Sequence, residues 1–316
     1  MRSFSFFLSI VLLFTSLSLA GEPMLFRFDD SHSFVGFNVK YLKLVQAEGR
    51  FNFVRGAFLV DTSDVTKSSF TAIIKTESVN TANEGRDEDL RGEDFFDVQK
   101  YPTIIFQSKK IEKQGTGYLL TGLFTMHGVT KEITMPMTHL GTTVDQRGTI
   151  RVGFESKSSL SRSAFGVSGS AMTVDDEVFF TITALTARQS LDSIRPMSFG
   201  GKKAIAAVMN ETINSKGVKD AIEQYKSLKA DTTYDASANQ LGMLIMRLAD
   251  KGKAKDAIEV AKLGVEIFPN DTQQYFRLGY AYQQDGNKDL AKENYKKALE
   301  LDVFNASAME MWRWVE

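Results

Sequence analysis

The residues that could do chemistry are concentrated in one acidic stretch, residues 86–106, which reads RDEDLRGEDFFDVQKYPTIIF. Paired carboxylates can act as general acid and base, or bind a hard cation. The spacing does not match a calcium loop, which needs ligands at set positions and a glycine at its turn. Arg86 and Arg91 alternate with the acids, and Asp87 and Arg91 would pair at helical spacing. We therefore interpret the stretch as a short charged helix over a hydrophobic interior, which is contacted by Leu90, Phe95 and Phe96.

Three histidines and one serine between glycines are the other candidates. His32, His127 and His139 would have to converge from separate elements to bind a metal, because no HxH or HxxxH pair is present. Ser168 lies in GVSGS, which lacks the spacing of a nucleophile elbow, and no glycine-rich phosphate loop occurs. We therefore expect no catalytic residue, no metal site and no cofactor, and a protein that is not an enzyme.

The composition excludes several classes of protein. Lys and Arg total 38 against 39 Asp and Glu, so no net field attracts the chain to nucleic acid or to an anionic membrane. Cysteine is absent, which rules out disulfides, thiolate catalysis and cysteine-bound zinc. Phenylalanine is unusually frequent at 24 residues, and this bias indicates a large apolar interior or cavity.

The elements that must position these residues fall into two halves with different hydrophobic periods. From residue 24 to residue 188 the period is two, in short segments rich in β-branched and aromatic residues. One face of residues 132–140, for example, carries Ile133, Met135, Met137 and His139. This pattern predicts an antiparallel sandwich or barrel. A barrel of about eight strands is either filled by its side chains or holds one small ligand, and the period does not decide between the two.

From residue 202 onward the period is helical, and an internal repeat occurs. Gly252 and Gly286 are 34 residues apart, as are Ala257 and Ala291, which is the spacing of a helix-turn-helix repeat. This half resembles the tetratricopeptide family. The best copy matches the family pattern at Tyr275, Leu278, Gly279, Tyr282, Gly286, Ala291, Tyr295 and Ala298. Stacks of such repeats contact proteins or peptides, so the resemblance implies an unknown protein partner, and a purely structural role is the alternative.

The N-terminus reads MRSFSFFLSIVLLFTSLSLAGEP, with an early arginine, an apolar run and then small residues. This pattern is typical of a cleaved secretory signal, and the apolar run is shorter than the ~20 residues that span a bilayer. We expect a signal peptide over 1–20, a β-barrel domain over 21–190, a linker over 191–201 and helical repeats over 202–316. The protein would then be secreted, in a bacterial periplasm, without an integral membrane segment.

A series of blocks in the first half resembles the YceI-like family of polyisoprenoid-binding, lipocalin-like domains. The blocks are, in order, FDDSHSFVGFNVKYL, GRFNFVRGAFLVD, KTESVNTANEGRDEDLRGEDFFDVQKYPTIIFQS, LTGLFTMHGVTKEITMP and LSRSAFGV. They cover almost all of residues 24–189, and the ordered set is specific although each block is weak alone. One departure is Asp89, which stands where the family usually has a histidine.

The resemblance implies a lipocalin-like antiparallel β-barrel around a long apolar tunnel, followed by the all-α repeats. The tunnel would hold an isoprenoid chain, such as a quinone tail. Its expected lining is Phe34, Phe37, Phe51, Phe53, Phe95, Phe96, Tyr101, Phe106, Leu120, Phe124, Phe154 and Phe165. His32, Asp87 and Arg162 would form a polar mouth. Ordinary core packing is the alternative for each aromatic residue, and a structural ion pair is the alternative for Arg162.

Three functions are then compatible with the sequence. The first is a lipid carrier or store whose repeats dock it to a partner. The second is a scaffold that acts through the repeats around a collapsed tunnel, with no bound lipid. The third, a hydrolase with Asp87, Asp89 or Glu93 as acid and base, ranks last because no nucleophile or metal set accompanies these residues.

Overall fold

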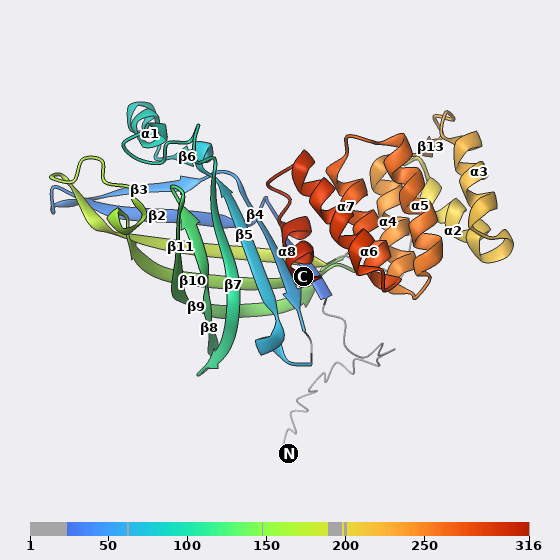
Figure 1. The fold of residues 1–316 in the computed structure, drawn as a ribbon, viewed down its shortest axis with the longest axis horizontal. Coiled ribbons are helices and arrows are strands. Elements are labelled where there is room, and N and C mark those ends of the chain that lie inside the picture. The colour runs from blue at the N-terminus through green and yellow to red at the C-terminus, as the bar shows by residue number, and fades with distance from the viewer. Residues whose placement is uncertain (1–23, 62, 147, 189–197, 199–200, 316) are drawn as a thin grey trace, which may run out of the picture.

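A computed structural model describes residues 24–61, 63–146, 148–188, 198 and 201–315 of the chain. A curved β-sheet built from the first half lies beside a stack of helices built from the second half (Figure 1). The expected fold class, mainly β followed by all-α, is confirmed. The expected signal peptide and most of the expected linker fall outside the described residues, so the domain boundaries stay predictions.

Eight antiparallel strands close into a barrel, because the last strand of the ring pairs with the first. The ring runs β1 (Met24–Phe28), β4 (Val54–Val60), β5 (Ser69–Lys75), β7 (Thr103–Gln114), β8 (Gly117–Met126), β9 (Val129–Val144), β10 (Ile150–Ser161) and β11 (Val174–Arg188). Alternation assigns the two faces of the wall: Phe26 and Phe28 are buried in the barrel core, whereas Arg27 contacts the helical half.

The sheet branches at β11, because both β1 and β2 pair with the same edge of this strand. β1 pairs with the C-terminal end of β11, and β2 (Phe34–Tyr41) pairs with the part before it. The sheet continues from β1 around the ring, and from β2 into the extension formed by β3 (Val45–Phe51) and β6 (Val79–Asn80). Short 3-10 turns lie between strands at η1 (Val65–Lys67), η2 (Thr76–Ser78) and η3 (Ser163–Phe165).

The acidic stretch begins as a short helix, as its charge pattern predicts. This helix, α1 (Glu84–Arg91), is capped by the side chain of Asn83. The expected pairing of Asp87 with Arg91 is wrong: Asp87 accepts hydrogen bonds from Thr81, and Arg91 donates to two backbone carbonyls. The apolar residues of the stretch contact the barrel core as expected, namely Leu90, Phe95 and Phe96.

The helices of the second half pack in successive antiparallel pairs (Figure 1). They are α2 (Ile205–Lys216), α3 (Val218–Leu228), α4 (Ala238–Asp250), α5 (Ala254–Ile267), α6 (Thr272–Gln284), α7 (Lys288–Leu301) and α8 (Ala306–Trp314), with a short parallel pair, β12 (Lys203–Ala204) and β13 (Tyr234–Asp235). A side chain at Gly279 would come within 2.7 Å of the Tyr295 ring, so α6 and α7 meet closely only because position 279 is glycine. None of the helices in the described ranges combines the length and the apolar character that a bilayer crossing requires.

The last described helix, α8, lies against the outer wall of the barrel at β4 and β5 (Figure 1). Ala306 of α8 is buried together with Ala57 and Ile73 of those strands. Next to this apolar patch, the carboxylate of Glu310 accepts hydrogen bonds from the hydroxyls of Ser69 and Thr71. The two halves of the chain are therefore joined by a packed interface.

Candidate functional site

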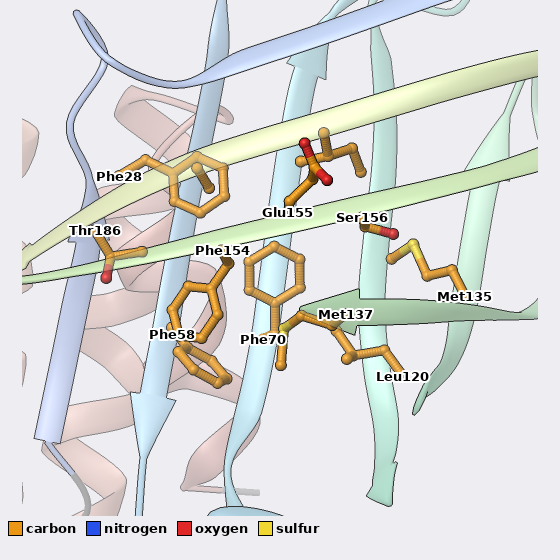
Figure 2. Close-up of a pocket in the computed structure, with 12 residues that line it drawn as sticks. Phe28, Phe58, Phe70, Leu120, Met135, Met137, Phe154, Glu155, Ser156 and Thr186 are labelled. Carbon is orange, nitrogen blue, oxygen red and sulfur yellow. The ribbon is translucent and has the colours of Figure 1, made fainter. Parts of the chain in front are cut away.

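The interior of the barrel is the candidate ligand site. Side chains from strands around the ring converge on an apolar cavity (Figure 2). Its lining residues are Phe28, Phe58, Phe70, Leu120, Met135, Met137, Phe154, Glu155, Ser156, Ile182, Ala184 and Thr186. The period of two explains much of this set, since the residues contributed by β9 and by β11 are spaced two apart and so face the same side of the wall.

The cavity is small because the phenylalanines fill the barrel themselves. The ring of Phe58 contacts the rings of Phe70 and Phe154 at centroid distances of 6.0 and 5.2 Å, and Phe70 contacts Phe28 at 5.7 Å. About 30 Å³ remains, which is room for about two water molecules and not for a hydrocarbon chain. In this conformation the barrel cavity is therefore not open as a tunnel, because the aromatic residues that predict an apolar bore fill it, and the tunnel stays a prediction.

One hydroxyl in the cavity wall has unused hydrogen-bonding capacity. Ser156 is 8% exposed, and its Oγ has no hydrogen-bond partner among the described residues. The other polar side chains of the lining are satisfied: Thr186 donates to a backbone carbonyl at 3.1 Å, and Glu155 pairs with Lys157 at 2.9 Å. The hydroxyl of Ser156 can therefore bind a hydroxyl or carbonyl oxygen inside an otherwise apolar site.

Replacing Ser156 by alanine is expected to raise the free energy of unfolding by about 1 kcal/mol, because a buried polar group without a partner costs about 1–3 kcal/mol. Denaturant unfolding followed by circular dichroism measures this change. Ser158→Ala, at a half-buried position of the same strand, is the matched control and should change stability less. A loss of stability in Ser156→Ala would show that the hydroxyl contributes to the fold and is not an unused group.

The predicted lining residues divide into three groups. Leu120 and Phe154 line the barrel cavity. Phe106, Phe124 and Phe165 belong to the same apolar core without bordering the cavity: Phe106 contacts Phe70 at 6.0 Å, and Phe124 contacts Phe165 at 5.3 Å. These last three residues therefore pack as ordinary core residues in this structure.

A second group gathers where the sheet extends into β2 and β3. A cavity of about 400 Å³ lies there, and its lining includes Phe37 and Phe95. The ring of Phe51 contacts those of Phe37 and Phe96 at 5.6 and 5.5 Å. The structure thus brings these four predicted residues together, but only Phe37 and Phe95 line this second cavity, and none of the four lines the cavity inside the closed ring.

Three predicted lining residues lie elsewhere, and their assignment is corrected. Phe34 is 39% exposed. Phe53 lies between β3 and β4, where the chain is no longer strand, and its ring packs on Phe304 of the helical half at 5.1 Å. Tyr101 precedes β7 and packs on His127 at 4.5 Å.

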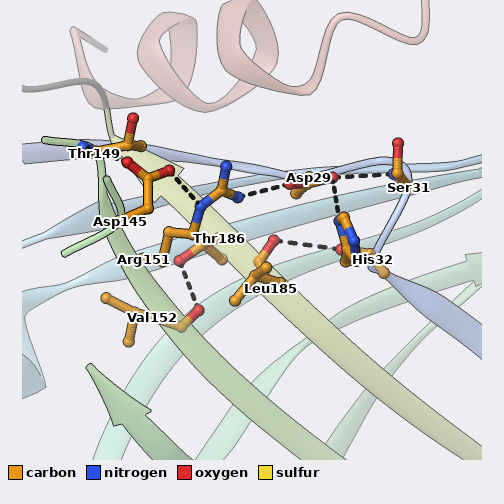
Figure 3. A network of polar contacts seen from close by, with 10 residues as sticks. Asp29, Ser31, His32, Asp145, Thr149, Arg151, Val152, Leu185 and Thr186 are labelled. Atoms are coloured by element: carbon orange, nitrogen blue, oxygen red, sulfur yellow. Dashed lines mark hydrogen bonds and ion pairs between the residues drawn. The ribbon is translucent and has the colours of Figure 1, made fainter. Parts of the chain in front are cut away.

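His32, expected at a polar mouth, belongs to a network of polar contacts (Figure 3). Its Nδ1 lies 3.0 Å from Asp29, and Arg151 bridges Asp29 and Asp145 at 2.6 and 2.9 Å. Burial acts to raise the pKa of Asp29, but hydrogen bonds from His32 and Arg151 outweigh it and hold this pKa below its usual value. Hydrogen bonds to Asp145 and Asp29 raise the pKa of Arg151. These polar groups bond to one another, and none of the four residues lines the barrel cavity.

Asp87 and Arg162, the other two expected mouth residues, also have structural partners. Asp87 is buried and accepts hydrogen bonds from the backbone N–H and the hydroxyl of Thr81 at 2.8 and 2.6 Å. Burial lowers the pKa of Arg162, whose guanidinium donates to the backbone carbonyls of Val167, Gly169, Val174 and Asp175. The three residues expected at a polar mouth therefore make separate structural contacts, and Arg162 binds backbone carbonyls while also attracting the carboxylate of Asp176.

The carboxylates proposed for a hydrolase do not share one environment. Asp87 is buried and hydrogen-bonded, whereas Asp89 and Glu93 are exposed. Among the described residues, no group of three or more histidines and carboxylates is arranged to hold a metal ion. Only one of the three carboxylates is buried, so the structure shows no buried acid and base pair among them.

Sequence reasoning selected only Leu120 and Phe154 of the twelve residues that line the cavity. The apolar residues it did not select are Phe28, Phe58, Phe70, Met135, Met137, Ile182 and Ala184. The signal was present for two of them, since Met135 and Met137 already stood on the apolar face predicted for residues 132–140. Methionine lines this cavity as phenylalanine does, and its flexible side chain suits an adaptable binding surface.

Comparisons with known protein families find a match in each half of the chain. The family model of the YceI-like domain matches residues 26–185, and that of a tetratricopeptide repeat matches residues 273–302. A UPF0312 protein of Yersinia pestis is 31% identical over 167 residues, covering 53% of this chain and 87% of that protein.

Two solved structures cover the same half. A YCEI protein of Campylobacter jejuni is 29% identical, with a TM-score of 0.44, covering 48% of this chain and 90% of that one. A polyisoprenoid binding domain from Saccharophagus degradans is 17% identical, with a TM-score of 0.40, covering 52% of this chain and 98% of that one. The family match spans the barrel from β1 to β11, and the chain belongs to the YceI-like family, with tetratricopeptide repeats in its second half.

Proposed function

We propose that the barrel binds one long apolar chain, such as that of an isoprenoid lipid or a quinone, and that the helical repeats bind a protein partner. The protein would act as a carrier or store without a catalytic step. The N-terminal sequence pattern supports a secreted, periplasmic location for it.

The observation that carries this proposal is the apolar interior of a closed barrel, held by side chains that can turn. Phe58, Phe154, Met135 and Met137 border the remaining cavity, and the methionines have three rotatable bonds each. Forcing extra methylene groups into a well-packed core costs typically about 1–3 kcal/mol. Each buried CH₂ of a guest returns about 0.8 kcal/mol, so a few isoprene units outweigh the cost of opening.

A scaffold role is the second candidate, and the filled interior favours it. With about 30 Å³ left in its interior, the barrel already has a complete hydrophobic core without any guest. In that case the barrel would serve as a rigid support for the repeats, and the protein partner alone would define the function.

Binding of a neutral prenyl alcohol to the whole secreted chain, measured by native mass spectrometry, separates the two. We expect a one-to-one complex, and we expect Ala184→Phe to abolish it, because a ring at this 4% exposed position fills the space that the guest must enter. Thr183→Phe is the matched control, since its side chain points to the opposite face of β11. If the wild-type chain takes up no prenyl alcohol, the scaffold function stands in place of the carrier.

A further inference from the structure

A third cavity lies outside the barrel wall, at the junction with the helical repeats. It has a volume of about 280 Å³, between one edge of the barrel at β1 and β11 and the helices α4 and α6. Its lining residues are Leu25, Arg27, Phe28, Ala187, Arg188, Asn239, Gly242, Met243, Met246, Asp250, Arg277 and Tyr280. Both halves of the chain therefore build it, and neither half contains it alone.

The junction cavity carries an excess of positive charge. Asp250 is the only carboxylate among the described residues that line it, and Arg188 pairs with it at 3.1 Å. Arg27 and Arg277 form no ion pair within the described part of the chain. Arg27 donates to the side chain of Gln273 at 3.2 Å and lies over the Phe276 ring at 4.7 Å, and Arg277 donates to a backbone carbonyl at 3.2 Å. Two guanidiniums thus face the cavity with no carboxylate of the described residues at ion-pair distance.

The surroundings of Arg27 and Arg277 disfavour the charged forms of both guanidiniums. Burial, together with the neighbouring guanidiniums of Arg277 and Arg55, lowers the pKa of Arg27 to about 10. Burial also lowers the pKa of Arg277, and the more distant charge of Asp271 offsets this only in part. A bound anion would relieve both effects, because it supplies the missing counter-charge and accepts hydrogen bonds from the guanidiniums.

The helix wall is shaped to admit one of these side chains. The guanidinium of Arg277 lies directly over Gly242 of α4, so that a Cβ at position 242 would come within 2.0 Å of its carbon. Glycine inside a helix costs about 1 kcal/mol relative to alanine. Gly242 thus holds open the place that Arg277 occupies beside the cavity.

The junction cavity also adjoins the interior of the barrel. Phe28 is the only described residue that lines both cavities. Its ring lies against Gly56 of β4, where a Cβ would come within 2.5 Å of it. The last residue of β1 therefore stands between the apolar interior and the two unpaired guanidiniums.

We infer that the junction cavity binds the anionic group, a carboxylate or a phosphate, of the lipid whose chain enters the barrel past Phe28. This inference rests on the proposed binding of an apolar chain in the barrel. It assigns Arg27 and Arg277 as the residues that select an acidic lipid over a neutral one, and it explains why the repeats are packed against this edge of the barrel.

The test compares two probes with the same chain, geranylgeranyl monophosphate and geranylgeraniol, by equilibrium dialysis with the whole chain. We expect the phosphate to bind tighter by on the order of tenfold or more, since charge-assisted hydrogen bonds are lost with the alcohol. Arg27→Gln and Arg277→Gln should remove this preference by weakening the binding of the phosphate far more than that of the alcohol. Gly242→Ala should act like Arg277→Gln by displacing the guanidinium, although alanine favours the helix. Arg50→Gln, at an exposed arginine that bonds to Asn52, is the matched control.

Each outcome decides a separate point. Equal affinity for the two probes in the wild-type chain would overturn the inference and leave the proposed lipid binding intact. Failure of both probes to bind would contradict the proposed function itself. Inorganic phosphate is the third probe: if it binds in the absence of any chain binding, and if Arg277→Gln abolishes that binding, the cavity is a site for a free anion and the headgroup assignment is wrong.

Discussion

Replacing Phe58 by alanine is expected to lower the free energy of unfolding of the barrel by about 3–5 kcal/mol, the usual cost of truncating a buried phenylalanine. Phe58 is 3% exposed and contacts two other rings of the barrel core, those of Phe70 and Phe154. Hydrogen exchange of the β4 and β5 amides measures the change within the barrel. This readout is preferable to a whole-chain melting temperature, because a chain with two packed halves need not unfold in one step.

The same substitution should enlarge the cavity and strengthen binding of a neutral prenyl alcohol. The space of the lost ring adjoins the cavity that already exists, so a guest can enter with less rearrangement of the core. Phe179→Ala is the control, since Phe179 is 42% exposed on β11. Loss of binding in Phe58→Ala, with the fold retained, would mean that the guest does not occupy this part of the barrel.

Replacing Glu310 by alanine is expected to cost about 3–5 kcal/mol at the interface between the two halves, the usual effect of removing one partner of a buried charge pair. Glu310 is 1% exposed, and its carboxylate accepts hydrogen bonds from Ser69 and Thr71 of β5. Arg313 donates to the same carboxylate at 3.1 Å and would be left without its ionic partner. A red shift of tryptophan emission reports release of α8, because both tryptophans of the chain lie on this helix.

Glu300→Ala provides the comparison for this second effect. Glu300 also pairs with a basic residue of its own helix, Lys297 at 3.2 Å, but on an exposed surface, where such pairs contribute about 0–1 kcal/mol. If the two substitutions destabilise the protein equally, the carboxylate of Glu310 does not hold α8 to the barrel.

The fold was predictable where the signal is local. The period of two and the helical repeat indicated both halves, and the alternation of Met135 and Met137 placed them on the correct face. Phe51 and Phe53 show where this logic fails. Two residues apart, they should share a face, but β3 ends at Phe51 and β4 begins at Val54, so Phe53 turns outward to Phe304. A break of two residues in a strand leaves no clear mark on the hydrophobic pattern.

The junction between the halves was not predictable from the sequence, for a different reason. Arg27 and Arg277 are far apart in the chain, and each looks like an ordinary surface arginine when taken alone. Their meeting depends on how the repeats pack against β1, and the closure of the tunnel depends likewise on the side-chain rotamers of Phe58 and Phe154. Neither the packing between the two halves nor the choice of side-chain rotamers produces a repeating pattern in the sequence.

The docking of α8 on β4 and β5 has a consequence for how the protein is made. Synthesis delivers every barrel strand before residues 306–314, so the barrel can close while Ala57 and Ile73 still face water. During that interval the outer surface of the barrel exposes an apolar patch to water. Domains that expose apolar surface are prone to aggregate or to need a chaperone. Helix α8 therefore covers this apolar patch only after all the barrel strands have been synthesised.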